Sequence, residues 1–297
     1  MKKALKVVGV VVVVLLVVAL VGVGGVYATS HSRQTAHFTP APSSFDIPTD
    51  EASVTEGRRL FSARGCADCH GEDAGGRVRL DDPALGRFVS ANLTHFASLD
   101  AQAWSTAVRD GLRADGTPLI FMPASELNPM PDRELAAIIA YVRTLPRVDS
   151  TLPATTIGPI ARAIDVLAGG LPLFTAHDVD HSRRPPDIAP GRSLEMGAYL
   201  GRGCTGCHGE HLSGGPIPGA PPEMGTPRNL TFHESGLAGW TEADLRAALR
   251  EGRTPDGGTL NPEQMPWRVM SAFLSDDEVG SLYDYLQTVP HRPEGER

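Results

Sequence analysis

The stretch CADCH at residues 66–70 decides the fold of this chain, and it returns as CTGCH at residues 204–208. In each copy two cysteines three positions apart fall on one face of a helical turn, so both sulfurs can bond to one planar group. The histidine that follows can then direct its ring at the centre of that group. This five-residue pattern is typical of covalent c-type haem attachment, in which the histidine is the proximal iron ligand.

The two motifs lie in a tandem repeat. We name residues 51–148 the first repeat and residues 191–297 the second repeat. Matching landmarks follow each motif in the same order: an Asn-Leu-Thr triplet, an Asp-Gly turn, a Met-Pro pair and a tyrosine. These landmarks begin at Asn92, Asp115, Met122 and Tyr141 in the first repeat, and at Asn229, Asp256, Met265 and Tyr285 in the second. A pattern repeated over this length indicates two copies of one structural unit.

Methionine is the expected second axial ligand in cytochromes c. The first repeat offers Met122 and Met130, and the second repeat offers Met265 and Met270. Only Met122 and Met265 occupy corresponding positions, each directly before a proline. We therefore take these two as the candidate ligands, and expect Met130 and Met270 to fill gaps in the cores, as methionine commonly does.

A zinc site and a redox-active dithiol are the other common uses of a Cys-x-x-Cys pair. A zinc site that pooled all four cysteines would leave both histidines and the paired methionines without a role. A dithiol requires neither the histidine nor the duplication. We therefore expect two covalently bound haem c groups. The attachment and ligand residues are Cys66, Cys69, His70 and Met122 in the first repeat, and Cys204, Cys207, His208 and Met265 in the second.

The N-terminus is expected to export the chain. Three lysines within the first six residues precede an uncharged run over residues 7–27, and about 20 apolar residues can cross a bilayer as a helix. Because the lysines should stay in the cytoplasm, residues 1–28 would anchor the chain in a bacterial inner membrane by a single pass, with the haem domains in the periplasm. The alternative is a signal peptide cleaved after Ala28, which would give a soluble periplasmic protein.

Hydrophobic periodicity predicts helices throughout both repeats. The expected helices cover residues 56–63, 132–145, 193–200 and 275–288. Asp100 and Thr241 are the expected N-caps of a further pair of helices. No strong alternating strand pattern is found, so the sequence predicts an all-α fold. Asn92 and Asn229 either bind haem propionates or cap a turn.

Two linkers complete the chain. Residues 29–50 join the N-terminal segment to the first repeat, and residues 149–190 join the repeats. The second linker carries one amphipathic helix, with a stripe of Ile and Leu side chains between residues 157 and 171. We expect this helix to pack across the two repeats; the alternative is that it lies on the membrane or docks a partner.

With a Cys-x-x-Cys-His motif and a Met-Pro pair in each repeat, the chain resembles the class I c-type cytochrome family in its tandem dihaem bacterial form. The resemblance covers both repeats and implies small all-α domains whose first and last helices cross over the haem. Gly57 and Gly197 would allow that close crossing, with Tyr141 and Tyr285 opposite. Similar tandem domains occur in cytochrome subunits of membrane-bound dehydrogenases, which pass electrons from a catalytic subunit to the respiratory chain.

The expected function is therefore electron transfer without catalysis, between a dehydrogenase and an oxidase or small cytochrome. A dihaem cytochrome c peroxidase is the alternative, but it needs an iron whose distal position can open, whereas both repeats keep a methionine at the same place. A haem-based sensor would need a signalling domain, and none is recognisable. The formal net charge of −8 argues against a nucleic-acid partner, which requires a basic surface. Leu99 stands where the second repeat has Trp240, so the two haem pockets need not be equivalent.

Overall fold

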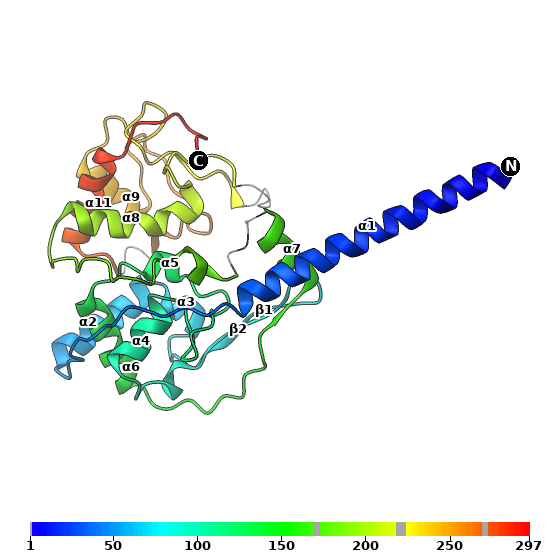
Figure 1. Ribbon diagram of the computed structural model, residues 1–297. Coiled ribbons are helices and arrows are strands. Elements are labelled where there is room, and N and C mark those ends of the chain that lie inside the picture. The colour runs from blue at the N-terminus through cyan, green and yellow to red at the C-terminus, as the bar shows by residue number, and fades with distance from the viewer. Residues whose placement is uncertain (1, 169–170, 172, 218–223, 269–272) are drawn as a thin grey trace.

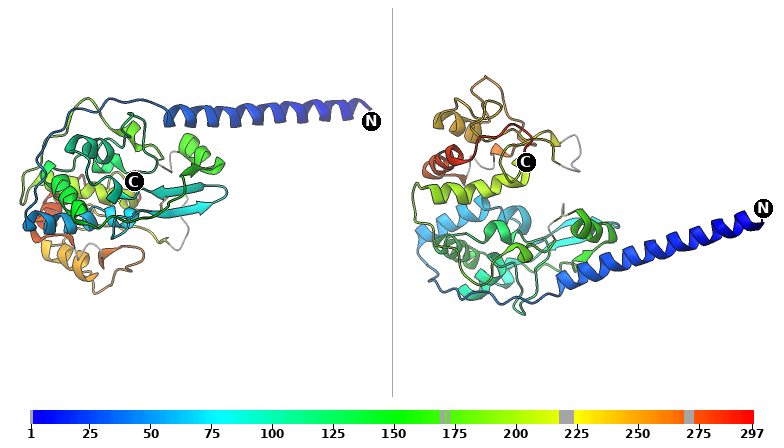
Figure 2. Two further views of the ribbon diagram at one scale, coloured as in Figure 1. Left: turned by 90° about the horizontal axis from the view of Figure 1, so that it is seen from below. Right: turned by 45° about the horizontal axis from the view of Figure 1, so that its top comes forward.

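The computed structural model describes residues 2–168, 171, 173–217, 224–268 and 273–297. One long helix, α1 (Lys2–Gln34), projects from a body in which the two repeats lie against each other (Figure 1). Two further views show α1 running clear of the body over most of its length (Figure 2). By length and composition α1 can cross a membrane, a property that a signal sequence shares.

The predicted helices of both repeats are present, although the leading helix of the first repeat begins earlier, and that of the second repeat ends later, than expected. The first repeat contains α2 (Glu51–Ala63), α3 (Cys66–His70), β1 (Arg77–Asp82), β2 (Gly86–Ser90), the 3₁₀ turn η1 (Leu93–His95), α4 (Ala101–Val108), α5 (Ala124–Leu127) and α6 (Asp132–Thr144). The second repeat contains α8 (Leu194–His208), α9 (Glu242–Glu251) and α11 (Asp276–Thr288). Both expected caps are confirmed, since the side chain of Asp100 accepts from Ala103 and that of Thr241 accepts from Asp244 at the start of their helices.

The first and last helices of each repeat cross at a glycine, as the family resemblance implies. A Cβ on Gly57 of α2 would lie 1.9 Å from the carbonyl oxygen of Ala137 in α6. A Cβ on Gly197 of α8 would lie 2.0 Å from the carbonyl oxygen of Ser281 in α11. No side chain fits in that space, so glycine is what brings each helix pair into backbone contact.

The helix that leads into the motif differs between the repeats. In the first repeat α2 ends at Ala63, and Gly65 takes a left-handed conformation with a φ of 75° before α3 begins. In the second repeat α8 continues unbroken to His208. The predicted end of that helix at residue 200 is therefore too early, because nothing between residue 200 and the motif breaks the helix.

A small sheet qualifies the all-α expectation. Strands β1 and β2 form an antiparallel hairpin, and β3 (Thr156–Ile157) of the linker pairs with β2. Phe88 on β2 is buried with Phe174 and other apolar side chains of the linker. This hairpin has only a weak sequence signal, since the alternation of Arg77, Val78, Arg79 and Leu80 is only four residues long.

The linker helix packs elsewhere than expected. It consists of α7 (Pro159–Ala163) and the π turn η2 (Ile164–Ala168), followed by the 3₁₀ turn η3 (Thr175–Asp178). Its buried side chains join the hairpin of the first repeat, and Arg162 donates to the hydroxyl of Ser30 on α1 at 2.8 Å. The prediction that it packs across the two repeats is therefore wrong: it lies between the hairpin and the end of α1.

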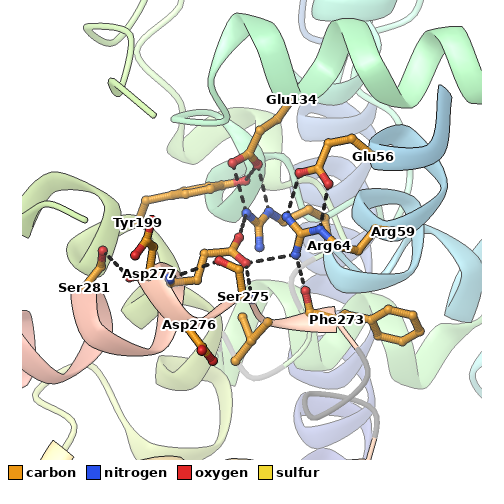
Figure 3. A network of polar contacts seen from close by, with 12 residues as sticks. Glu56, Arg59, Arg64, Glu134, Tyr199, Phe273, Ser275, Asp276, Asp277 and Ser281 are labelled. Carbon is orange, nitrogen blue, oxygen red and sulfur yellow. Dashed lines mark hydrogen bonds and ion pairs between the residues drawn. The ribbon is translucent and has the colours of Figure 1, made fainter. Parts of the chain in front are cut away.

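The repeats are joined by a buried network of charged side chains (Figure 3). Arg64, between α2 and α3, donates to Glu134 of α6 at 2.9 and 3.0 Å and to Glu278 of α11 at 2.8 Å. None of these three side chains is more than 7% exposed. Arg59 of α2 adds a second bond to Glu278 at 2.9 Å, and the hydroxyl of Tyr199 of α8 donates to Glu134 at 3.3 Å.

Apolar side chains close the rest of this interface. Met196 and Tyr199 of α8 are buried in the core of the first repeat, with Leu135 and Ile139 of α6 in the same cluster. Leu200 packs against the cores of both repeats. The two repeats therefore share a continuous interface.

Candidate haem sites

Each Cys-x-x-Cys-His motif lies on helix, as its spacing requires. Residues 66–70 form α3, and residues 204–208 form the last turn of α8. No disulfide joins the four cysteines. Burial raises the pKa of the Cys66 thiol to about 12 and that of Cys204 to about 11. The first cysteine of each motif is partly buried and packs against the core of its repeat.

The two motif histidines make the same contact. Nδ1 of His70 lies 2.8 Å from the carbonyl oxygen of Ala91, and Nδ1 of His208 lies 2.6 Å from the carbonyl oxygen of Arg228. A carbonyl only accepts, so each Nδ1 carries the hydrogen and each Nε2 carries the lone pair. Burial lowers the pKa of both imidazoles, although the carbonyl contact opposes this effect. A neutral imidazole with its outer N–H held in this way is the form that binds a metal.

The asparagines next to these carbonyls fix the loops that carry them. Oδ1 of Asn92 accepts from the backbone N–H of Thr94 at 3.0 Å, and Oδ1 of Asn229 accepts from that of Thr231 at 2.8 Å. Their amide groups donate to the carbonyls of Val148 and Arg292, in both cases at 2.7 Å.

Of the two roles open to these asparagines, the structure shows the capping of a turn. The turn sets the position of the preceding carbonyl, and that carbonyl sets the tautomer of the histidine. The sequence pointed to Asn92 and Asn229 through the repeat, but it contained no sign of their link to the histidines.

The candidate methionines have corresponding surroundings. Met122 is partly buried against the core of the first repeat, and Met265 is partly buried against the core of the second. Met130 is 2% exposed and belongs to the core, which agrees with its expected role as a core residue. Met270 lies outside the described residues.

A tryptophan in the first repeat supplies an independent test of whether the site fits a haem. Trp104 of α4 is 4% exposed, and its indole N–H is buried without an acceptor among the described residues. Such a group is costly unless a ligand accepts from it, and a porphyrin carries two propionates that can. Together with paired cysteines and a histidine whose Nε2 is available, this donor set fits a covalently attached haem.

The tryptophans of the second repeat are arranged differently. Trp240 packs against the core there, whereas its counterpart Leu99 is 41% exposed. The indole N–H of Trp267 donates to the carbonyl of Leu260 at 3.1 Å, and its ring lies against Gly252. The two repeats therefore differ in where their tryptophans lie, and the difference in their haem pockets stays a prediction.

The zinc alternative finds no support in the geometry. Over the described ranges, which include all four cysteines, no group of three or more His, Cys, Asp or Glu side chains is placed to hold a metal ion. Each cysteine pair lies on a helix of its own repeat.

Comparison with known proteins agrees with a haem at each motif. A family model for cytochrome c matches residues 54–146 and 196–290. The fructose dehydrogenase cytochrome subunit of Gluconobacter japonicus is 25% identical over 281 residues, which are 86% of this chain and 55% of that protein. The alcohol dehydrogenase (quinone) cytochrome c subunit of Gluconobacter oxydans is 24% identical over 284 residues, 83% of this chain and 56% of that protein. A diheme cytochrome c-type protein of Cereibacter sphaeroides is 27% identical over 283 residues, 84% of this chain and 89% of that protein.

The chain thus spans little more than half the length of these two dehydrogenase subunits and most of the length of the dihaem cytochrome. The two regions matched by the family model cover more than half of the chain, and each contains one Cys-x-x-Cys-His motif and one of the two crossed helix pairs. The chain belongs to the cytochrome c family.

Proposed function

We propose that this chain is a membrane-anchored dihaem c-type cytochrome that carries electrons on the periplasmic side of a bacterial inner membrane. One haem c is attached at Cys66 and Cys69, and the other at Cys204 and Cys207. His70 with Met122, and His208 with Met265, are the axial ligands. Haem supplies one-electron chemistry, and the protein supplies its attachment, its orientation and the ligands that tune its potential.

One observation carries this proposal: the contact between a motif histidine and a backbone carbonyl is built twice, with the same atoms, in the two repeats. A structural histidine needs no such duplication. A pair of equivalent ligands does, because each must present Nε2 to its own iron.

The partners follow from chemistry and from the relatives. Several relatives bear names of cytochrome subunits of dehydrogenases, so we propose a dehydrogenase as the electron donor. An oxidase or a small cytochrome would be the acceptor. The formal net charge of −8 favours a basic protein at that contact, because complementary charge speeds encounter.

Replacement of the methionines tests the ligand assignment. Met122→Ala and Met265→Ala should each remove about half of the near-infrared sulfur-to-iron absorption of the oxidised protein, and each should lower one haem potential, because thioether ligation raises it. Met130→Ala is the matched control. It lies in the core and should cost stability while leaving the absorption intact. Loss of the band in Met130→Ala, but not in Met122→Ala, would overturn the assignment.

The peroxidase alternative is tested on the half-reduced protein. No feature of the described residues favours it over electron transfer. We expect electron exchange with a small basic cytochrome to be fast and peroxide turnover to be negligible. Rapid peroxide turnover, with one haem becoming five-coordinate, would contradict the proposal.

A further inference from the structure

The linker lies against the loop that carries Met122. The backbone N–H of Phe121 donates to the carbonyl of Leu173 at 2.8 Å. The hydroxyl of Thr175 donates to the carbonyl of Met122, and it accepts from the backbone N–H of Ala124 at 3.0 Å. Thr175 is 5% exposed, so water does not readily replace these bonds. One side chain thus holds the backbone on both sides of the Met122–Pro123 step.

The loop needs support at this point. Phe121 has a φ of 61°, in the left-handed region that residues with a Cβ rarely adopt. Its ring is exposed on one side and stacks on Phe88 of the hairpin, with centroids 5.3 Å apart. A backbone in this region persists when its surroundings hold it. Here those surroundings are the hairpin and the linker.

Among the described contacts of the Met265 loop, no bond corresponds to the one from Thr175. Both loops share one local bond: the N–H of Ala124 donates to the carbonyl of Met122 at 2.8 Å, and the N–H of Trp267 donates to that of Met265 at 2.7 Å. A second backbone bond of Met265 is also local, from its N–H to the carbonyl of Asn261 at 2.9 Å. Thr175 adds to the first repeat a contact from a distant part of the chain.

The linker segment is in turn fixed to the end of α1. A ring nitrogen of His177 lies 2.9 Å from the carbonyl oxygen of Arg33. The side chains of Arg33 and Asp165 approach to 3.6 Å, and Asp165 is 5% exposed. The linker segment that contacts the Met122 loop is therefore itself held by the C-terminal end of α1.

We infer that Thr175 is a positioning residue for Met122, which makes the methionine of the first haem harder to displace. Thr175 acts through the backbone of the loop and does not touch the iron site itself. The inference rests on the proposed function, in which Met122 is an axial ligand. Without the hydroxyl, the Met122 carbonyl and the Ala124 N–H each lose one partner and keep the local bond that joins them. The loop is then freer to swing the thioether away.

The test is a titration of the oxidised, full-length, haem-loaded protein with imidazole, followed through the near-infrared band. In wild type, one half of the band belongs to Met122 and the other half to Met265. In Thr175→Val, which keeps the shape and removes the hydroxyl, the half that belongs to Met122 should titrate at roughly 5- to 150-fold lower imidazole concentration. The half that belongs to Met265 should not move. Thr175→Ser should restore the wild-type titration, because it restores the hydroxyl.

Thr144→Val is the matched control. The Thr144 hydroxyl also donates to a backbone carbonyl, that of Tyr141 at 2.7 Å, but on the last turn of α6. A shift of the same size in Thr144→Val, or no shift in Thr175→Val, overturns the inference. Met122→Ala distinguishes a failure of the ligand assignment from a failure of the inference about Thr175. If Met122→Ala removes half of the band, the ligand assignment holds. An unchanged Thr175→Val titration then refutes only the role of Thr175. If Met122→Ala leaves the band whole, the assignment fails and the inference falls with it.

Discussion

Arg64 should be the residue on which the junction of the two repeats depends most. It is buried between Glu134 of one repeat and Glu278 of the other, at 2.9 and 2.8 Å. Arg64→Met would leave two carboxylates facing each other in the interface. Removing one member of a buried ion pair costs about 3–5 kcal/mol, and the lower end applies here because Arg59 still pairs with Glu278.

The pKa of Glu278 gives a second value for the stability that these ion pairs contribute. Burial alone would raise this pKa, but the charges of Arg64 and Arg59 and a backbone contact at Ser275 lower it from 4.5 to about 2. Each pKa unit corresponds to about 1.4 kcal/mol, so this lowering of the Glu278 pKa corresponds to about 3 kcal/mol of folding stability. Since the folded pKa lies below the unfolded value, this contribution is complete above about pH 5 and disappears as the pH falls toward about 2.

The assay is urea unfolding of the full-length haem-loaded protein at several pH values, with haem absorption and tryptophan fluorescence followed separately because two repeats need not unfold together. Arg64→Met should lose about 3 kcal/mol at pH 7. The control Arg192→Met removes an exposed arginine that pairs with Asp284 and Glu242, and it should lose much less stability because solvent screens exposed ion pairs. Equal losses in the two variants, or an acid dependence in Glu278→Gln as steep as in wild type, would refute this reasoning.

Three further outcomes are expected. Purified protein should carry two haems that survive acid–acetone extraction, and replacing Cys66 and Cys69 together with Ala should leave one; haem that is fully extractable would contradict covalent attachment. Trp104→Phe should lower one haem potential and leave the other unchanged in spectroelectrochemistry, because a propionate would lose its N–H donor; two unchanged potentials would remove Trp104 from the site. The chain should stay with the membrane fraction until detergent is added, whereas a mature N-terminus at Thr29 would establish cleavage.

Features that depend on residue type at a fixed spacing could be predicted from the sequence. The closing helices and the caps at Asp100 and Thr241 belong to this class, and the family resemblance adds the glycine crossings at Gly57 and Gly197. Each is decided by a side chain, or the lack of one, and the duplication allowed every such position to be checked against its counterpart.

Features that depend on distant backbone could not be predicted. The carbonyls of Ala91 and Arg228, which hold the motif histidines, carry no sequence signal because every residue has a carbonyl. The partners of Arg64 lie 70 and 214 residues away along the chain. The bond from Thr175 reaches across 53 residues, and threonine is common in linkers for many reasons.

The continuity of α1 with the body restricts how a membrane-anchored form of this protein can meet its partners. Ser30 of α1 is fully buried against Arg162 of the linker, only about one helical turn beyond the apolar run that ends at Tyr27. If α1 spans the bilayer, this contact would restrict rotation of the body relative to the helix and would keep the body near the membrane surface. The haem edges would stay at a nearly constant distance from the lipid. The protein would then meet a membrane-bound donor by lateral diffusion in two dimensions. A water-soluble acceptor would instead have to approach the membrane surface. Its approach would therefore depend on the charge of the lipid surface as well as on that of the protein.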